Sequence, residues 1–275
     1  MQAVGNANGL KALDVSIDGA FRAAGVPRAK VAAVCMGLAG VDRTNGLDVI
    51  HDWATKVDLA ASLQVANDAT LLLAAGTPDG WGLAVIAGTG SIAFVERQDG
   101  HVGRGGGWGY LLGDEGSAYA IALSGLRAAC RSYDGVGPKT LLVERFVKSM
   151  GLQDASDMIL AVYQGPWDRT AIAGLAPVVM EAAAGGDAIA IGIVRHESGE
   201  LAQTAAAAII SSSLPMSDLP VALAGGVLTK SEAYREEFLG ALLALGVSVG
   251  PVQLVTDPVA GAIVLARKAA AMSHS

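Results

Sequence analysis

The sequence predicts an α/β protein with two domains. Short apolar runs typical of buried strands alternate with segments of helical spacing in both halves of the chain. A turn-rich segment, Gly76-Thr77-Pro78-Asp79-Gly80, separates the halves. The 275 residues are enough to bury two hydrophobic cores. We therefore expect one domain over residues 1–78 and a second over 79–260.

Composition narrows the class of partner. Apolar residues make up 52% of the chain and charged residues 16%, which is typical of a folded globular protein. The net charge of −7, with no cluster of Lys and Arg, argues against a nucleic acid or an anionic membrane as partner. The apolar runs are interrupted before they reach membrane-spanning length, and the N-terminus has no basic segment followed by an apolar one. We expect a cytoplasmic protein with a small-molecule partner, and a homodimer is compatible with the sequence.

Cysteine and histidine usage bears on the chemistry. The two cysteines, Cys35 and Cys130, form neither a disulfide framework nor a metal-binding pattern, which favours a reducing compartment. The four histidines are scattered along the chain, so a metal site or a catalytic triad is not expected from them.

In the first half, strands and helices are expected in alternation. Apolar residues at helical spacing over 10–24 predict a helix that stops at Gly25. The run 31–39 reads as a buried strand, 47–53 as a helical stretch and 63–66 as a second strand. An Ala- and Leu-rich helix then extends to Ala75.

The second half is expected to begin with a hairpin and to continue through a long helical region. Two apolar strands are joined through Gly88-Thr89-Gly90, and Asp99-Gly100 marks the next turn. The expected elements are strands over 82–87 and 91–95, helices from 115 to 213, strands over 221–224 and 252–255, and a helix from 260 into the Ala-rich tail.

A glycine-rich stretch over residues 103–118 is the most informative segment for function. Glycine lowers the cost of backbone conformations that other residues avoid, and it lets backbone approach a ligand. Trp108 lies between glycines, where an aromatic face can stack on a sugar. A glycine-rich hairpin loop without a ligand is the alternative on glycine content alone.

This stretch contains two motifs, Gly106-Gly107-Trp108-Gly109 and Gly113-Asp114-Glu115-Gly116-Ser117-Ala118-Tyr119. Together they resemble the sugar-site signature of N-acetylglucosamine kinases, within the BadF-type ATPases of the sugar-kinase/Hsp70/actin superfold. The resemblance implies a ribonuclease H-like (actin-like ATPase) fold of two domains with an interdomain cleft, in which the last helix, 261–275, joins the first domain. It assigns Gly107, Trp108, Gly109 and Asp114 to sugar binding, and a carboxylate suits sugar hydroxyls as a strong acceptor.

The turn Gly88-Thr89-Gly90-Ser91 can present backbone N–H groups and a hydroxyl to a phosphate. By itself it is equally an ordinary hairpin. Its position before the glycine-rich stretch resembles the second phosphate motif of the superfold. The resemblance therefore implies that Thr89 contacts the nucleotide and that Ser91 and Ile92 lie beside the sugar.

Asp68 follows a strand directly, at the end of the strand where α/β sheets bind their ligands. A helix N-cap is the common alternative for an Asp at such a junction. The resemblance instead implies a general base that hydrogen-bonds the 6-hydroxyl of the sugar. It also implies that Asn8, just before the first long helix, binds the sugar, although a turn or N-cap Asn would look the same.

The strand 221–224 runs into Gly225-Gly226, which resembles the adenosine motif of the family. Gly225 and Gly226 would let the base and ribose lie against backbone. Ala183 matches a family residue that lines the nucleotide, although an Ala there is equally a helix-packing residue. A strand that simply ends in glycine is the plainer alternative for the first motif.

One family motif is absent from the sequence. The family begins with a strand that carries Asp-Gly-Gly-Gly-Thr-Lys, whose turn holds the β- and γ-phosphates and whose Asp helps place Mg²⁺; no such segment occurs here. The first domain is therefore expected to be N-terminally truncated, and the chain to be catalytically weak until it is extended upstream, because phosphoryl transfer depends on positioning and charge neutralisation.

The expected function is phosphorylation of an amino sugar, N-acetylglucosamine or glucosamine, at the 6-hydroxyl with ATP and Mg²⁺. The alternative is a sugar-binding regulator of the same family that has little or no catalytic activity. An iron–sulfur dehydratase activator, another branch of the family, is disfavoured because Cys35 and Cys130 do not lie in a Cys-Gly-rich loop.

Overall fold

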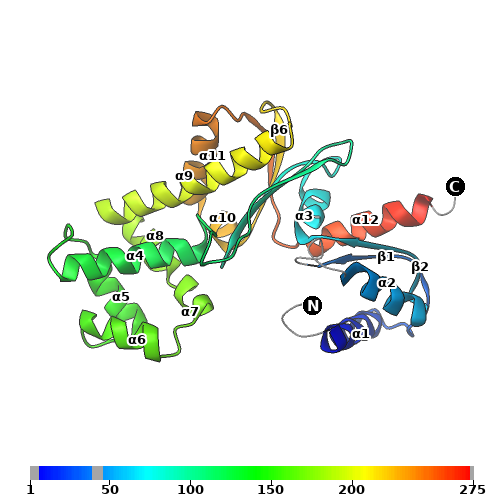
Figure 1. The fold of residues 1–275 in the computed structure, drawn as a ribbon, viewed down its shortest axis with the longest axis horizontal. Helices are drawn as coiled ribbons and strands as arrows, with labels where there is room; N and C mark the ends of the chain where they lie inside the picture. The colour runs from blue at the N-terminus through cyan, green and yellow to red at the C-terminus, as the bar shows by residue number, and fades with distance from the viewer. Residues whose placement is uncertain (1–5, 39–45, 273–275) are drawn as a thin grey trace. The chain divides into compact units, whose positions relative to one another are not determined.

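The computed structural model describes residues 6–38 and 46–272. The chain divides into two compact units, Met1–Ala75 with Asp257–Ser275, and Gly76–Thr256 (Figure 1). The C-terminal segment thus belongs to the same unit as the N-terminal one.

The first unit contains a parallel pair of strands with helices. Its elements are α1 (Asn6–Ala23), β1 (Val31–Gly37), α2 (Gly46–Lys56), β2 (Ala60–Ala66), α3 (Asp68–Gly76) and α12 (Val259–Met272). Gly37 at the end of β1 lies opposite Ala66 at the end of β2. A small core of Ile50, Trp53 and Leu59 supports this pair.

The structure corrects one expectation about this unit. The run 31–39 was expected to be a buried strand, but β1 ends at Gly37 and most of its residues are only half-buried. Among the described residues the sheet holds two strands, so β1 has a hydrogen-bonded neighbour on one side only.

The second unit is organised around a five-stranded mixed sheet. Its strands are β3 (Gly82–Ala87), β4 (Ser91–Glu96), β5 (Val102–Gly106), β6 (Leu219–Ala224) and β7 (Val249–Leu254). Their order is β5-β4-β3-β6-β7, with β3, β4 and β5 antiparallel and β3, β6 and β7 parallel. The strands β3 and β6 at the centre are almost wholly buried, as their continuous apolar runs predict.

The region between β5 and β6 is helical, as the sequence predicts. It contains α4 (Ala118–Tyr133), α5 (Leu142–Met150), a 3₁₀ turn (Ala155–Asp157), α6 (Met158–Gln164), α7 (Arg169–Ala173), α8 (Ala176–Ala184) and α9 (Ala188–Ser211). After β6 come α10 (Gly226–Lys230) and α11 (Glu232–Ala244).

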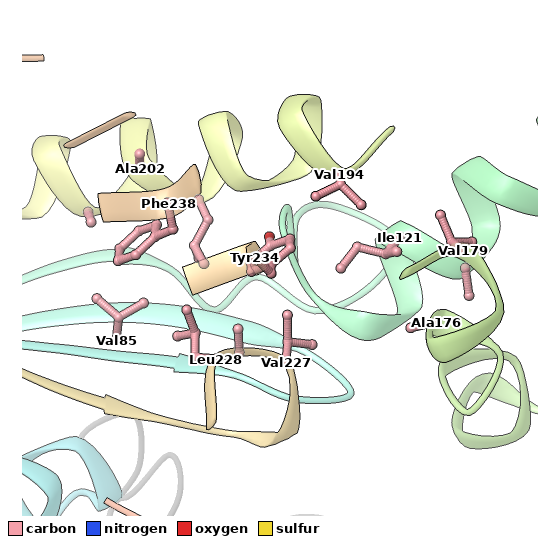
Figure 2. Packing of buried hydrophobic residues seen from close by; sticks show 14 of the residues in the cluster. Val85, Ile121, Ala176, Val179, Val194, Ala202, Val227, Leu228, Tyr234 and Phe238 are labelled. Carbon is pink, nitrogen blue, oxygen red and sulfur yellow. The ribbon is translucent and has the colours of Figure 1, made fainter. Parts of the chain in front are cut away.

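The core of the second unit lies between the sheet and its helices. Figure 2 shows Phe238 and Tyr234 of α11 between α9 and the sheet, with Val85 of β3 facing Phe238. Phe238 and Tyr234 are fully buried. At about 25 cal/mol per Å² of buried apolar surface, side chains of this size dominate the stability of the layer.

None of the described helices combines the length and the apolar character that crossing a membrane requires.

Candidate functional site

The turn between β3 and β4 lies at the centre of the candidate site. The Gly88 N–H donates to the Gly90 carbonyl (2.9 Å), which closes the turn. The Ala118 N–H donates to the Gly88 carbonyl (2.8 Å), which ties the start of α4 to it. Thr89 is exposed at the tip. The base of the turn is therefore held by hydrogen bonds at Gly88, while Thr89 at its tip stays accessible.

A cavity of about 650 Å³ opens beside this turn. It is bordered by the turn, the start of α4, and α7, α8 and α10. Its lining comprises Gly88, Thr89, Ala118, Thr170, Ala173, Gly174, Ala176, Pro177, Met180, Glu181, Ala184, Gly226, Val227, Lys230 and Ser231. Thr89 and Gly226, both predicted to bind the nucleotide, thus line one cavity of a size suited to a small ligand.

Gly225 has a backbone role next to this cavity. Its φ is +86°, and a Cβ built on it would collide with the Ala87 carbonyl. At Gly226, by contrast, a Cβ would meet no atom within 4 Å. Only glycine therefore fits at the first position, because the end of β6 passes close against the end of β3.

Ala183 lies in a neighbouring cavity. That cavity measures about 570 Å³ and also includes Tyr234 and Ser198 in its lining. The two cavities share Met180, Ala184 and Ser231. Ala183 is thus near the first cavity but does not line it together with Thr89.

The glycine-rich loop after β5 uses its glycines for conformation. Gly107 and Gly109 have φ of +68° and +84°, in the region that glycine tolerates best. A Cβ on Gly107 would lie 2.9 Å from Ile92 Cδ1, so the Ile92 side chain packs where glycine leaves room. Trp108 is 62% exposed, and the Arg104 guanidinium carbon lies 5.3 Å from the centre of its ring. An exposed aromatic ring is thus presented beside a cation.

Asp114 is buried and already paired. The residue is 3% exposed and its side chain 5%, and its φ is +66°. Oδ2 accepts from Arg169 Nη2 at 2.8 Å, and Oδ1 accepts from the Ser91 N–H at 3.3 Å. The Ser91 hydroxyl donates to the Glu115 carbonyl at 2.7 Å. A buried carboxylate needs such hydrogen-bond partners, and each oxygen keeps further acceptor capacity for a ligand.

A second set of buried contacts holds the end of this loop. The Gly116 N–H donates to Glu197 Oε2 (3.0 Å), and the Tyr234 hydroxyl donates to the Gly116 carbonyl (2.9 Å). Ser124 donates to the other Glu197 oxygen at 2.8 Å. Burial, with the nearby Glu197 charge, raises the pKa of the Tyr234 phenol, so it remains a donor. Gly116, two residues after Asp114, is thereby held at both its N–H and its carbonyl.

The predicted base and the predicted sugar-binding Asn belong to the first unit. Asp68 is the exposed first residue of α3, one residue after Asn67, which follows the end of β2. Asn67 caps this helix, since its Oδ1 accepts from the Thr70 N–H at 2.8 Å. The common N-cap reading of Asp68 is therefore wrong: Asn67 has that role, and no hydrogen bond or ion pair of the Asp68 carboxylate is seen within residues 6–38 and 46–272.

Asn8 differs in position from the expectation. It was expected just before the first long helix, but α1 already begins at Asn6, and Asn8 is an exposed residue of its first turn. Asn8 is itself exposed, and a polar residue exposed to solvent is compatible with a helix that already begins at Asn6.

In the described part of the chain, no three His, Cys, Asp or Glu side chains gather where they could hold a metal ion. Mg²⁺ in phosphoryl transfer is commonly held by phosphates, waters and one or two carboxylates, which does not require such a group. Asp114, the carboxylate beside the turn, is engaged by Arg169 and Ser91. No residue is therefore assigned to the metal.

Sequence reasoning missed four residues that shape the site: Arg104, Arg169, Glu197 and Tyr234. Glu197 had a detectable signal, because it is an acidic residue on a face of α9 that is otherwise Ala- and Leu-rich. Arg169 follows the helix-capping Asp168 in an unremarkable polar segment, so nothing local indicated its contact with Asp114.

Comparison with known proteins gives consistent results. Residues 1–266 match the model of the BadF/BadG/BcrA/BcrD ATPase family. The chain is 32% identical over 235 residues to an N-acetylmuramic acid/N-acetylglucosamine kinase of Clostridium acetobutylicum, covering 86% of this chain and 77% of that protein. It is 36% identical over 165 residues to an N-acetyl-D-glucosamine kinase of Dictyostelium discoideum, covering 58% of this chain and 51% of that one.

A solved structure from Chromobacterium violaceum, described as a candidate N-acetylglucosamine kinase, is similar with a TM-score of 0.72 and 26% identity, over 95% of this chain and 85% of that one. The α/β fold class and the family predicted from the motifs are therefore confirmed. This protein belongs to the BadF/BadG/BcrA/BcrD ATPase family.

Proposed function

We propose that this protein transfers the γ-phosphoryl group of ATP to the 6-hydroxyl of an amino sugar, N-acetylglucosamine or glucosamine. Membership of an ATPase family supports the nucleotide, and the names of its relatives support the sugar. A cytoplasmic location belongs to the proposal, since both cysteines are free thiols and ATP is the phosphoryl donor.

One observation carries the proposal: the Gly88–Gly90 turn borders both halves of the candidate site. Gly88 and Thr89 line the 650 Å³ cavity. Gly90 lies against the sugar-site carboxylate, because a Cβ built on it would be 2.7 Å from Asp114 Oδ2. A nucleotide in the cavity would thus have its phosphates at the turn, next to the residue proposed to hold the sugar.

The residues have distinct proposed roles. The turn and Thr89 would contact the phosphates through N–H and hydroxyl groups, and Gly225 and Gly226 would seat the adenosine. Asp114, with the Trp108 loop, would hold the sugar hydroxyls. Asp68, an exposed carboxylate without a partner among the described residues, would take the proton from the 6-hydroxyl. Bound Mg²⁺ would supply charge neutralisation on the phosphates.

The domain assignment is part of the same proposal. We take residues 1–78 with 261–275 as the domain that carries Asn8 and Asp68. Residues 79–260 then form the domain that carries the sugar loop and the nucleotide cavity.

The direct test measures ADP release with a coupled assay. Glucosamine, N-acetylglucosamine, N-acetylmuramic acid and glucose are offered in parallel to the full chain, and melting is followed to show that it is folded. We expect ADP release that depends on an amino sugar and exceeds release with glucose. Equal inactivity on all four sugars by a folded chain contradicts the proposal. If calorimetry then shows sugar binding without turnover, the regulator alternative replaces it.

The role of Asp68 has its own test. Asp68→Asn keeps the shape of the side chain but cannot accept the proton, so turnover should fall by about 10²–10⁴-fold while sugar affinity stays within about tenfold. Asp114→Ala should instead weaken sugar binding first. Asp48→Asn, which changes an exposed Asp in the first turn of α2, is the matched control and should keep full activity. Loss of all sugar affinity in folded Asp68→Asn would show that the assigned role is wrong.

A further inference from the structure

Arg169 makes the shortest contact to the Asp114 carboxylate. Its Nη2 lies 2.8 Å from Oδ2, while the backbone donor from Ser91 is 3.3 Å from Oδ1. Asp114 is 3% exposed and holds a φ of +66°, so its conformation depends on the groups that contact it. The orientation of this carboxylate is therefore set largely by the guanidinium.

The guanidinium is itself held by shape. Its central carbon lies 5.3 Å from the centre of the Tyr110 ring. A Cβ on Gly90 would be 2.6 Å from Nη2, so the arginine fills the space that this glycine leaves free. Nε is buried and has no hydrogen-bond partner in the described part of the chain. The guanidinium is thus restrained by its bond to Asp114 and by packing against Tyr110 and Gly90, while its side chain stays partly exposed.

The helix that carries Arg169 also forms a wall of the nucleotide cavity. In α7, Thr170 and Ala173 line the cavity, as does Gly174 directly after it. Asp168 caps this short helix, with Oδ1 accepting from the Ala171 N–H at 2.8 Å. A ligand that presses on this wall acts on the same short element that orients the guanidinium. The nucleotide and Asp114 are thus connected through a single turn of backbone.

We propose that Arg169 is a positioning residue that presets Asp114 for the sugar and makes sugar affinity depend on nucleotide binding. The inference rests on the proposed function. Sugar binding orders the Arg169–Asp114 pair and so costs conformational entropy. A nucleotide that immobilises α7 orders part of this pair beforehand, which lowers that cost and raises sugar affinity. By thermodynamic reciprocity, the sugar then raises nucleotide affinity by the same factor.

The test measures N-acetylglucosamine binding to the full chain by calorimetry, with and without a non-hydrolysable ATP analogue. For the unmodified protein we expect the analogue to raise sugar affinity at least about threefold. Arg169→Met removes the donor but keeps an apolar stem, and it should lower sugar affinity by about tenfold and bring the ratio with and without analogue close to one. Arg169→Lys keeps the charge without the planar fork and should retain part of both effects.

Arg127→Met, at an exposed arginine of α4, is the matched control and should keep both affinity and ratio. If Arg169→Met does not fold, Arg169→Lys carries the comparison. A folded Arg169→Met with unchanged sugar affinity and an unchanged ratio overturns the inference. So does an unmodified protein that binds the sugar and releases ADP but shows a ratio of one, and in that case the proposed function stands. No sugar binding and no turnover in the unmodified protein instead rejects the proposed function.

Discussion

Alanine should have different effects at Gly225 and Gly226. We expect Gly225→Ala to lower stability, because the backbone requires glycine there, and Gly226→Ala to weaken ligand binding. Gly225→Ala places a Cβ against the Ala87 carbonyl, at φ +86° and ψ 150°. Such a backbone conformation costs a non-glycine residue about 1–3 kcal/mol. Relieving the clash by moving β3 or β6 adds about 1–3 kcal/mol, as overpacking in a close-packed core does.

The expected destabilisation by Gly225→Ala is therefore about 2–6 kcal/mol, or a fall in melting temperature of roughly 4–24 °C for a unit of this size. Gly226→Ala has a normal φ and free space for its methyl, so its melting temperature should stay close to that of the unmodified protein. Its methyl would enter the cavity that Gly226 lines and should weaken binding of an ATP analogue.

Thermal denaturation followed by circular dichroism, together with calorimetric titration of the analogue, distinguishes the two variants. If Gly225→Ala melts within about 2 °C of the unmodified protein, the ends of β6 and β3 are not so close that a Cβ at this position is excluded. If Gly226→Ala binds the analogue with unchanged affinity, the cavity is not the nucleotide site.

Two further predictions concern stability. Phe238→Ala should lower the free energy of unfolding by about 3–5 kcal/mol, since the ring is fully buried between α9 and the sheet. Leu243→Ala, on the exposed side of α11, should change it little. Equal denaturation midpoints for the two variants would contradict the packing. Burial opposes the charge on Asp187, but hydrogen bonds from Ala190, Leu141 and Thr140 outweigh it and lower its pKa. A pKa that is lower in the folded than in the unfolded state gives stability that is present above about pH 4 and is lost as pH falls through the folded pKa. The difference in melting temperature between the unmodified protein and Asp187→Asn should therefore narrow below about pH 4. A difference that stays constant from about pH 7 to 3 would refute this.

The site residues that come just after strand ends could be predicted from the sequence. Thr89 follows β3 and Gly226 follows β6, each separated from the apolar run of its strand by one glycine. Because β3 and β6 are parallel neighbours, their carboxyl ends meet at one edge of the sheet, where α/β folds bind ligands. Apolar runs and turn residues are local signals, so the strands and the turn were accessible without a structure, whereas the pairing of β3 with β6 was not.

The helix start at Asp68 shows where local signals are ambiguous. Asn67 and Asp68 are both good N-cap residues, and a sequence that contains them side by side does not say which one caps. The Thr70 N–H donates the capping hydrogen bond to Asn67, so the Asp68 carboxylate does not cap the helix. A shift of one residue in the helix start decides between a structural and a chemical role.

The sequence by itself determined the family, the α/β class and the glycine positions around the site, because these depend on short motifs, periodicity and backbone conformation. Only the tertiary structure decided what holds Asp114 and its loop. Arg169 lies 55 residues from Asp114, Glu197 lies 81 residues from Gly116, and Tyr234 lies 118 residues from Gly116. Each of these contacts forms when elements distant in sequence pack together, as α7 does against α4 and α11 against α9, so the polar partner is selected by packing geometry that no local pattern records.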